Sequence, residues 1–150
     1  MKESIQFGFT LIELLIVISI IGILASLTLV SYSGAQKQAR DSQRKSDLGQ
    51  IKNSLENYAG TNNGMYPTTV GAVADFSTIC PVPLTNNFIS VCLKDPLDTV
   101  AVPRVYHYAS DGYSYLLYAN TESAAAYWFT CSSGKNGSLG VQPALAANCN

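Results

Sequence analysis

Charge is scarce in this sequence, and so are the side chains on which enzymes most often depend. Only 13% of the 150 residues are charged and the net charge is -1, so the chain as a whole has no electrostatic attraction for nucleic acid or anionic lipid. The single histidine, His107, lies in a Tyr-rich segment where we expect it on the surface of a sheet. Gly134-Lys135 lacks the earlier glycine and the following Ser or Thr of a phosphate loop. We therefore expect one domain with a modest core, no enzyme activity and no cofactor.

None of the four cysteines belongs to a C-x-x-C pair, which argues against a zinc knuckle or a thioredoxin-like site. Their even number and wide spacing favour disulfides in an oxidising compartment, with four buried free thiols as the alternative. Of the three possible connectivities we predict the two local disulfides, Cys80–Cys92 and Cys131–Cys149. The first would close a proline-rich loop, and the second would fix the tail to the last predicted strand.

Contiguous apolar sequence is confined to FGFTLIELLIVISIIGILASLTLV, residues 7–30. As a helix, residues 9–30 would span about 33 Å, enough to cross the hydrocarbon core of a membrane. A secretory signal peptide has a shorter apolar core, and GILASL is a weak cleavage site. A plain single-span anchor is the other ordinary interpretation. Neither accounts for Glu13, because a carboxylate at membrane depth costs about 2.5–3.5 kcal/mol.

The polar leader MKESIQFG ends in Gly8, and FTLIE follows it directly. These residues resemble the type IV pilin family, which includes the pseudopilins of type II secretion. The resemblance implies that a membrane-embedded prepilin peptidase cuts after Gly8 and methylates the new N-terminal Phe9. It also implies a role in assembly for Glu13, whose carboxylate the amine of an incoming subunit can neutralise. Such a buried ion pair is better suited to fixing register than to adding net stability.

The segment after the apolar run predicts a continuous helix, because no proline or strong breaker lies between Leu11 and Tyr58. We expect this helix to end at Gly60 and to pack on a sheet. The charges from Lys37 to Lys52 predict a solvated or intersubunit face. Counting Lys and Arg in residues 31–52 would place the C-terminal part in the cytoplasm, but the cleavage motif and the cysteines require it outside. The apolar stripe of the helix recurs at three- and four-residue steps and consists of Leu48, Ile51, Leu55, Tyr58 and Ala59.

The head, residues 61–150, predicts a small antiparallel sheet of three strands. In NNGMYPTT, Gly64 suits a left-handed turn and Pro67 prevents the helix from continuing. Residues 68–104 predict a connecting loop. VYHYASDGYSYLLYA then predicts a hairpin with Asp111-Gly112 at the turn, AAYWFTC a third strand, and the tail after Cys131 a loop. The expected fold is α+β and, as the resemblance implies, a pilin-like roll: leader 1–8, membrane helix 9–30, amphipathic continuation 31–60 and head 61–150.

Calcium is the one metal for which the sequence offers candidate ligands. Major pseudopilins bind it near their C-terminus, and KDPLD and SDG resemble parts of that region. Oxygen ligands would come from Asp95, Asp98 and Asp111. The closing glycine-rich pattern of that family is absent, and a loop between Cys131 and Cys149 stands in its place. We therefore expect no metal.

The resemblance implies a structural subunit and leaves three hypotheses. The first, which we expect because the cysteine-closed tail favours a pilin over a major pseudopilin, is a major pilin that polymerises into a surface filament for adhesion, twitching or DNA uptake. The second is a pseudopilin that drives secretion, and the third is a membrane-anchored enzyme. The expected partners are further copies in a helical filament, prepilin peptidase, the assembly platform, minor pilins, and the cytoplasmic membrane for the precursor. With only Lys94, Arg104 and Lys135 in the head, we expect no direct nucleic-acid binding.

Overall fold

The computed structural model describes residues 8–80, 88–99, 104–123 and 126–149, and within the long helix only the backbone of residues 27–31. This helix, α1, runs from Leu11 to Thr61, as the unbroken sequence predicts. The chain divides into two compact units, Met1–Gln36 and Lys37–Asn150, and we treat each by itself. At the end of α1, Asn63 and Gly64 have positive φ values of 56° and 77°. The Gly64 N–H donates to the carbonyl of Ala59 at 2.8 Å, so the predicted turn closes the helix.

The described part of the head contains five antiparallel strands in the order β1-β2-β3-β4-β5, so each strand pairs with its neighbour in sequence. The hairpin of β2 and β3 has the register Ser110↔Tyr115, and Gly112 in its turn has a φ of 98°. The strands are β1 Ala74–Asp75, β2 His107–Ser110, β3 Tyr115–Asn120, β4 Tyr127–Cys131 and β5 Asn136–Leu139, with short helices α2 Phe76–Ile79 and α3 Leu145–Asn148.

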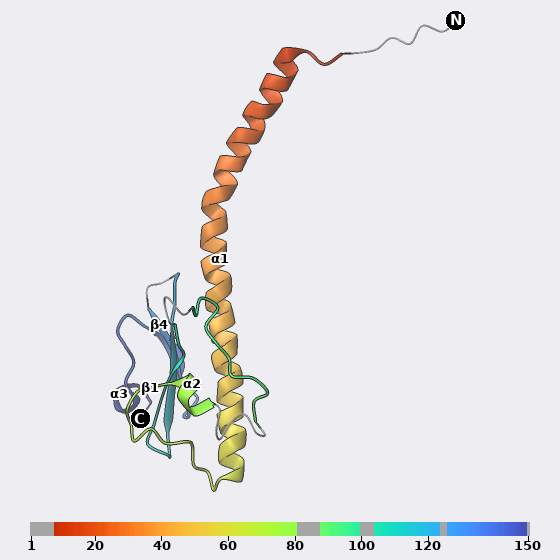
Figure 1. The fold of residues 1–150 in the computed structure, drawn as a ribbon. Coiled ribbons are helices and arrows are strands. Elements are labelled where there is room, and N and C mark those ends of the chain that lie inside the picture. Colours follow the sequence, from red (N-terminus) through yellow and green to blue (C-terminus); the bar gives the residue numbers. More distant parts are fainter. Residues whose placement is uncertain (1–7, 81–87, 100–103, 124–125, 150) are drawn as a thin grey trace, which may run out of the picture. The chain divides into compact units, whose positions relative to one another are not determined.

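The main core lies between one face of the sheet and the part of α1 that belongs to the head (Figure 1). Leu48, Ile51 and Leu55 of α1 are buried there, as their spacing predicts. The sheet contributes alternate side chains, because successive residues of a strand point to opposite faces. The buried members from the sheet and from the segments beside it are Phe76, Cys80, Tyr106, Tyr108, Tyr115, Leu117 and Ala119.

A second apolar cluster covers the opposite face of the sheet, where α3 and the C-terminal tail lie in Figure 1. Leu116, Tyr118 and Phe129 point to this side, and the tail adds Leu145 and Cys149. Gln142 of the tail donates to the hydroxyl of Tyr118 at 2.6 Å. β3 is consequently buried from Tyr115 to Ala119 on both faces, although its sheet is antiparallel.

Two predictions about the head are wrong in detail. The sheet has five strands where three were predicted, because β1 forms inside the expected loop 68–104 and β5 inside the expected loop of the tail. β1 is only two residues long and β5 reads NGSL, so neither carries the alternation of apolar residues that marks a strand. Both are edge strands, which form where a neighbouring strand offers backbone partners rather than where the local sequence favours them.

Candidate functional site

The start of α1 is closed by a hydrogen-bonded pair of side chains. The Glu13 carboxylate accepts hydrogen bonds from the backbone N–H of Thr10 at 2.9 Å and from its hydroxyl at 2.7 Å. The Glu13 N–H in turn lies 3.3 Å from the Thr10 hydroxyl oxygen. This reciprocal arrangement is a capping box, in which the residue before the helix and the third helical residue satisfy each other. Glu13 therefore has a partner within its own chain.

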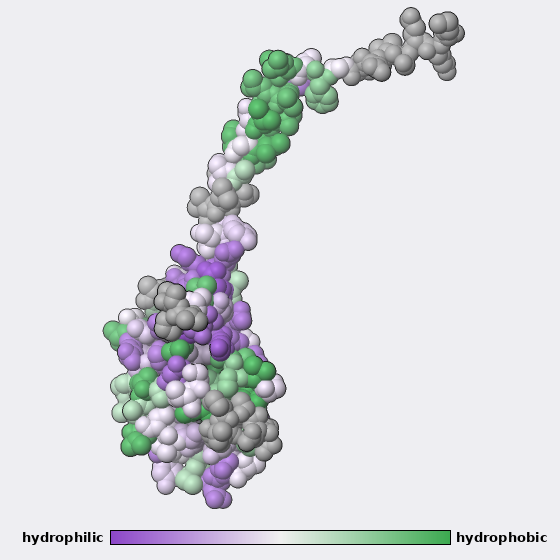
Figure 2. Space-filling model, in the orientation of Figure 1, coloured by the Kyte–Doolittle hydropathy of each residue, from purple (hydrophilic) through white to green (hydrophobic). Residues whose placement is uncertain are grey.

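The first part of α1 exposes apolar side chains at most positions from Leu11 to Leu24. The face that Figure 2 shows is apolar over this segment. Ile12, Ile16 and Ile20 are each at least half exposed. A contiguous apolar surface of this size calls for a covering of lipid or protein. Within the part of the chain that the structure describes, no helix combines the length and the hydropathy needed to cross a membrane. The span predicted for residues 9–30 includes side chains outside that part and stays a prediction.

Gly8 and Phe9 precede α1 in irregular backbone, and Phe9 is 84% exposed. The remainder of the predicted leader, residues 1–7, lies outside the described residues. An exposed, non-helical bond between Gly8 and Phe9 is the form a protease requires. Cleavage after Gly8, methylation of Phe9 and the assembly role of Glu13 stay predictions.

A cluster of charges forms where α1 enters the head, and we call it the Arg44 cluster. The Arg44 side chain is fully buried and donates to both carboxylate oxygens of Asp95, at 2.6 and 2.9 Å. It also donates to Asp41 and Glu122, each at 2.7 Å. Arg40 adds a second bidentate pair with Glu122, at 2.9 and 2.7 Å. The cluster thus joins α1 to two separate loops of the head, because Asp95 follows the Cys80–Cys92 segment and Glu122 follows β3.

Two carboxylates of the Arg44 cluster, those of Asp41 and Glu122, are held ionised by their neighbours. Burial alone would raise the pKa of Asp41, but hydrogen bonds from Ser123, from the Glu122 N–H and from Arg44 outweigh it and lower the pKa to about 2. Hydrogen bonds from Arg40 and Arg44 likewise lower the pKa of Glu122 to about 2. Such charge-assisted bonds are roughly twice as strong as neutral ones. Breaking the cluster from one side would leave a buried charge without a partner.

The prediction that the charges between Lys37 and Lys52 form a solvated or intersubunit face is wrong for Asp41, Arg44 and Asp47, which are buried. Asp47 accepts a hydrogen bond of 2.6 Å from the Tyr106 hydroxyl. Burial and this hydrogen bond to a carboxylate together raise the pKa of Tyr106. The sequence shows these charges at helical spacing, but their partners come from segments that only the fold brings near.

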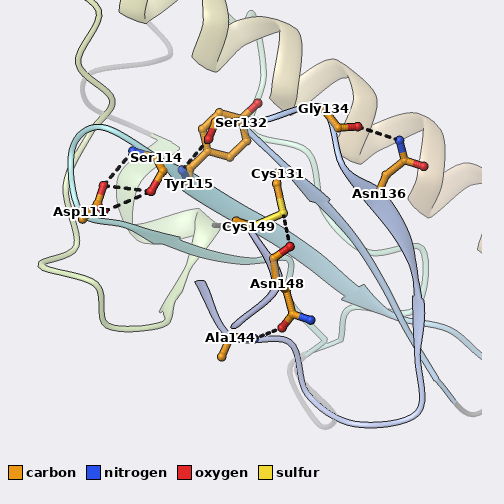
Figure 3. Close-up of a disulfide and its surroundings, with 10 residues drawn as sticks. All are labelled: Asp111, Ser114, Tyr115, Cys131, Ser132, Gly134, Asn136, Ala144, Asn148 and Cys149. Carbon is orange, nitrogen blue, oxygen red and sulfur yellow. Dashed lines mark hydrogen bonds between the residues drawn. A yellow bond between two sulfur atoms is a disulfide. The ribbon is translucent and has the colours of Figure 1, made fainter. Parts of the chain in front are cut away.

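Both disulfides of the predicted pairing are present, Cys80–Cys92 and Cys131–Cys149. Figure 3 shows the second at the end of β4, where it holds the residue after α3. The side chain of Asn148 folds back beside it and accepts a hydrogen bond of 2.7 Å from the Ala144 N–H. The tail is therefore fixed to the sheet both covalently and through its own short helix.

The three carboxylates considered for calcium have other partners. Asp95 belongs to the Arg44 cluster, and Asp98 accepts from the Arg104 N–H at 3.0 Å. Asp111 accepts from the N–H groups of the hairpin turn that it begins, at 2.9 and 2.7 Å. No group of three metal-ligating side chains occurs among the described residues. The structure does not bring Asp95, Asp98 and Asp111 together as a site.

Comparison with known proteins agrees with the N-terminal features. Residues 4–29 match the family described as the prokaryotic N-terminal methylation motif. The chain is 38% identical over 102 residues to the type II secretion system core protein G of Aeromonas hydrophila, a match that covers 64% of this chain and 71% of that protein. It is 33% identical over 96 residues to the Escherichia coli K12 protein of the same name, covering 62% and 66%. No solved structure matches the chain.

A second group of relatives consists of pilins. The chain is 43% identical over 54 residues to the type IV major fimbrial protein FimA of Dichelobacter nodosus, which covers 36% of this chain and 35% of that protein. The matched N-terminal motif, a capped apolar helix with Glu13 and a head of antiparallel strands are the features of the pilin class. The chain belongs to the type IV pilin family, in the wide sense that includes the pseudopilins of type II secretion.

Two features of the site were missed from the sequence. The role of Thr10 as the capping residue could have been predicted, because T-x-x-E before an apolar run is the pattern of a capping box. The Arg44 cluster had no such signal. Asp41 lies 3 residues from Arg44 in the sequence, but Asp95 lies 51 residues away and Glu122 lies 78 residues away.

Proposed function

We propose that this chain is a pseudopilin, a structural and non-enzymatic subunit of a short filament that serves type II secretion. The observation that carries the proposal is the extent of the match to core protein G. It covers 64% of the chain, which is more than the leader and α1 together, so it includes residues of the head. The FimA match covers 36%, an amount that the N-terminal part could supply alone. The head distinguishes subunits of one filament system from those of another, because the N-terminal helix is shared.

The physical basis of the proposed assembly lies in the first part of α1. Exposed apolar side chains supply a large but non-directional driving force for helices to pack together. Glu13 supplies direction, because its carboxylate, which its own Phe9 amine could also neutralise, pairs with another subunit only where that subunit's Phe9 amine reaches it. In the free subunit the capping box with Thr10 satisfies that carboxylate. The precursor is held in the cytoplasmic membrane, and prepilin peptidase releases the amine on which assembly depends.

A major pilin is the second candidate, and the Cys131–Cys149 disulfide favours it. The family resemblance associates major pseudopilins with a calcium loop in this region, whereas here a disulfide and α3 fix the tail. On this alternative the chain would build a long surface filament for adhesion, twitching or DNA uptake. The greater share of the chain matched by core protein G is the reason we rank the pseudopilin first.

Deletion of the gene in its own host separates the two candidates. The secreted proteins are measured in the culture medium, and surface filaments are counted by electron microscopy with an antibody to the head. We expect secretion to fail while surface pili persist, and wild-type protein should restore secretion. A Gly8→Leu variant, expressed at the same level, should not. Loss of surface filaments with normal secretion would show that the chain is a pilin.

A further inference from the structure

The face of the sheet that packs on α1 is covered only in part. The helix lies over β2 and β3, where the buried side chains of the main core gather. Beside it, Lys45, Leu48 and Lys52 of α1 and Trp128, Thr130 and Asn136 of β4 and β5 line a groove of about 260 Å³. We call it the Trp128 groove. The Lys45 ammonium lies 4.3 Å from the centre of the Trp128 ring, a cation–π contact.

The charge of the Trp128 groove is of one sign. Neither Lys45 nor Lys52 makes an ion pair among the residues that the structure describes, where every ion pair involves Arg40 or Arg44. Among the residues that the structure describes, none of those lining the groove is a carboxylate. Two ammonium groups two helical turns apart, about 10 Å along the axis, thus stand beside an aromatic ring with no internal counter-charge. Charge complementarity calls for an occupant with at least two acidic groups.

A second copy of this chain fits this requirement poorly. Every carboxylate described in the head already accepts a hydrogen bond within its own chain. Asp41, Asp95 and Glu122 belong to the Arg44 cluster, and Asp47 bonds Tyr106. The remaining carboxylates accept hydrogen bonds as well: Glu56 from Tyr66 and Tyr115, Asp75 from Ser77, Asp98 from Arg104, and Asp111 from Tyr113 and Ser114. Because these carboxylates are already engaged within their own chain, a different molecule is the better source of the acidic groups.

The neighbouring strand favours a protein over other anions. β5 is the last strand of the sheet, and its outer backbone edge pairs with no strand in the described chain. Its four residues, Asn136–Leu139, contain no proline that would block pairing. An extended peptide can satisfy those N–H and C=O groups while its side chains reach the adjacent groove. A polysaccharide or a nucleic acid offers no matching row of amides.

We propose that the Trp128 groove and the edge of β5 form a docking site for an extended, acidic segment of a different protein. Lys45 and Lys52 bind its carboxylates, and Trp128 packs against its apolar side chains. This site lies in the head and makes no use of Glu13 or Phe9, so it stands whether the chain is a pseudopilin or a pilin.

Trp128 is the single tryptophan of the chain and reports directly on the groove. The test titrates the full-length protein, in a zwitterionic detergent, with a short peptide that alternates glutamate and valine. We expect a saturable change in tryptophan fluorescence that weakens as salt is added. Changing Lys52→Gln should weaken binding by about tenfold, and adding Lys45→Gln should weaken it further. Lys94→Gln removes an exposed lysine outside the groove and serves as the matched control, which should bind normally.

Each other outcome overturns the proposal. A peptide with glutamine in place of glutamate that binds equally well would remove the charge argument. Tighter saturation by oligodeoxythymidine or by a sulfated polysaccharide would assign the groove to a different polymer. A fluorescence change that follows the protein concentration alone would assign it to a second copy. The absence of any saturable change with the acidic peptide would leave the groove without this function.

Discussion

At the scale of single residues, Glu13 has one observed partner and one proposed partner. The structure gives it Thr10, through a capping box that satisfies the start of α1. The proposed filament gives it the Phe9 amine of another subunit. These roles separate chemically, since the capping box needs only a hydrogen-bond acceptor and the amine needs a negative charge.

We expect Glu13→Ala to reduce filament yield sharply and to enlarge the membrane pool of processed subunit. Glu13→Gln keeps the acceptor and loses the charge, so its yield should be intermediate. Removal of the leader and stability of the head should not change, because neither involves Glu13. Thr10→Ser keeps the capping hydroxyl and is the matched control. Filaments are quantified by immunoblotting of sheared fractions, and normal filaments built from Glu13→Ala subunits alone would refute the assembly role.

The Arg44 cluster makes the head sensitive to acid. The pKa values of Asp41 and Glu122 fall from ordinary values of 3.8 and 4.5 to about 2 on folding. The unfolded chain therefore binds more protons than the folded chain between about pH 4.5 and pH 2, and stability is lost as the pH falls through this window. We expect each carboxylate to account for on the order of 2 kcal/mol in the free energy of unfolding.

The free energy of unfolding is measured across this pH range by urea titration, with circular dichroism as the readout. A Glu122→Gln variant should be less stable than the wild type at pH 7 and should show a flatter dependence on pH. Glu56→Gln is a suitable control, because Glu56 lies outside the cluster. An identical acid dependence in Glu122→Gln and the wild type would contradict the assignment of the titration to this cluster.

At the scale of elements, the tail is the part of the head whose position depends most on a covalent bond. α3 has four residues, too few to be stable as an isolated helix, and the Cys131–Cys149 disulfide holds it on the outer face of the sheet. The tail covers Leu116, Tyr118 and Phe129, which explains why an antiparallel strand such as β3 is apolar on both faces.

Replacing Cys131 and Cys149 together with serine should destabilise the head by roughly 3 kcal/mol, according to the loop-entropy estimate for a closed loop of this size. The tail should then become accessible to proteases, and the outer face should bind a hydrophobic dye. Limited proteolysis and thermal unfolding check this, with a Cys80 and Cys92 double replacement as the comparison. If peptide mapping of the wild type links Cys80 to Cys131 or Cys149, the predicted pairing is refuted.

At the scale of the whole molecule, the proposed function requires the chain to exist in two forms. The uncut precursor keeps its leader. The mature subunit starts at Phe9 and carries a free amine at the N-terminus of an exposed apolar helix. Gly8 stands at the junction, where its lack of a side chain allows close approach of the protease. Among the described residues, a Cβ added at Gly8 would meet no atom within 4 Å apart from its chain neighbours. The need for glycine at this position should therefore come from the peptidase and not from the fold.

We expect Gly8→Leu to leave an unprocessed precursor that stays with the membrane and forms no filaments. The head should remain folded, with both disulfides intact. Mass spectrometry of assembled filaments should find methylated Phe9 as the first residue of the wild-type subunit. Filaments whose subunits begin at Met1 or Lys2 would show that the leader is retained.

The sequence by itself determined the elements whose information is local. The length of α1, its apolar stripe, the left-handed turn at Gly64 and the hairpin at Asp111-Gly112 follow from periodicity and from turn residues, which act within a few positions. The N-terminal motif is equally local, since the predicted peptidase site and the capping box lie within residues 8–13. The disulfide pairing could also be predicted from the sequence, because each disulfide joins two consecutive cysteines of the chain.

Only the tertiary structure decided the rest, because it depends on residues far apart in the chain. β1 and β5 form because β2 and β4 offer them backbone partners, and the NGSL sequence of β5 alone gives no such signal. Arg44 is charged and regularly spaced like its neighbours on α1, so its burial could not be read from the helix. Its carboxylate partners come from two loops, and a buried guanidinium is tolerated only where the fold brings such partners to it.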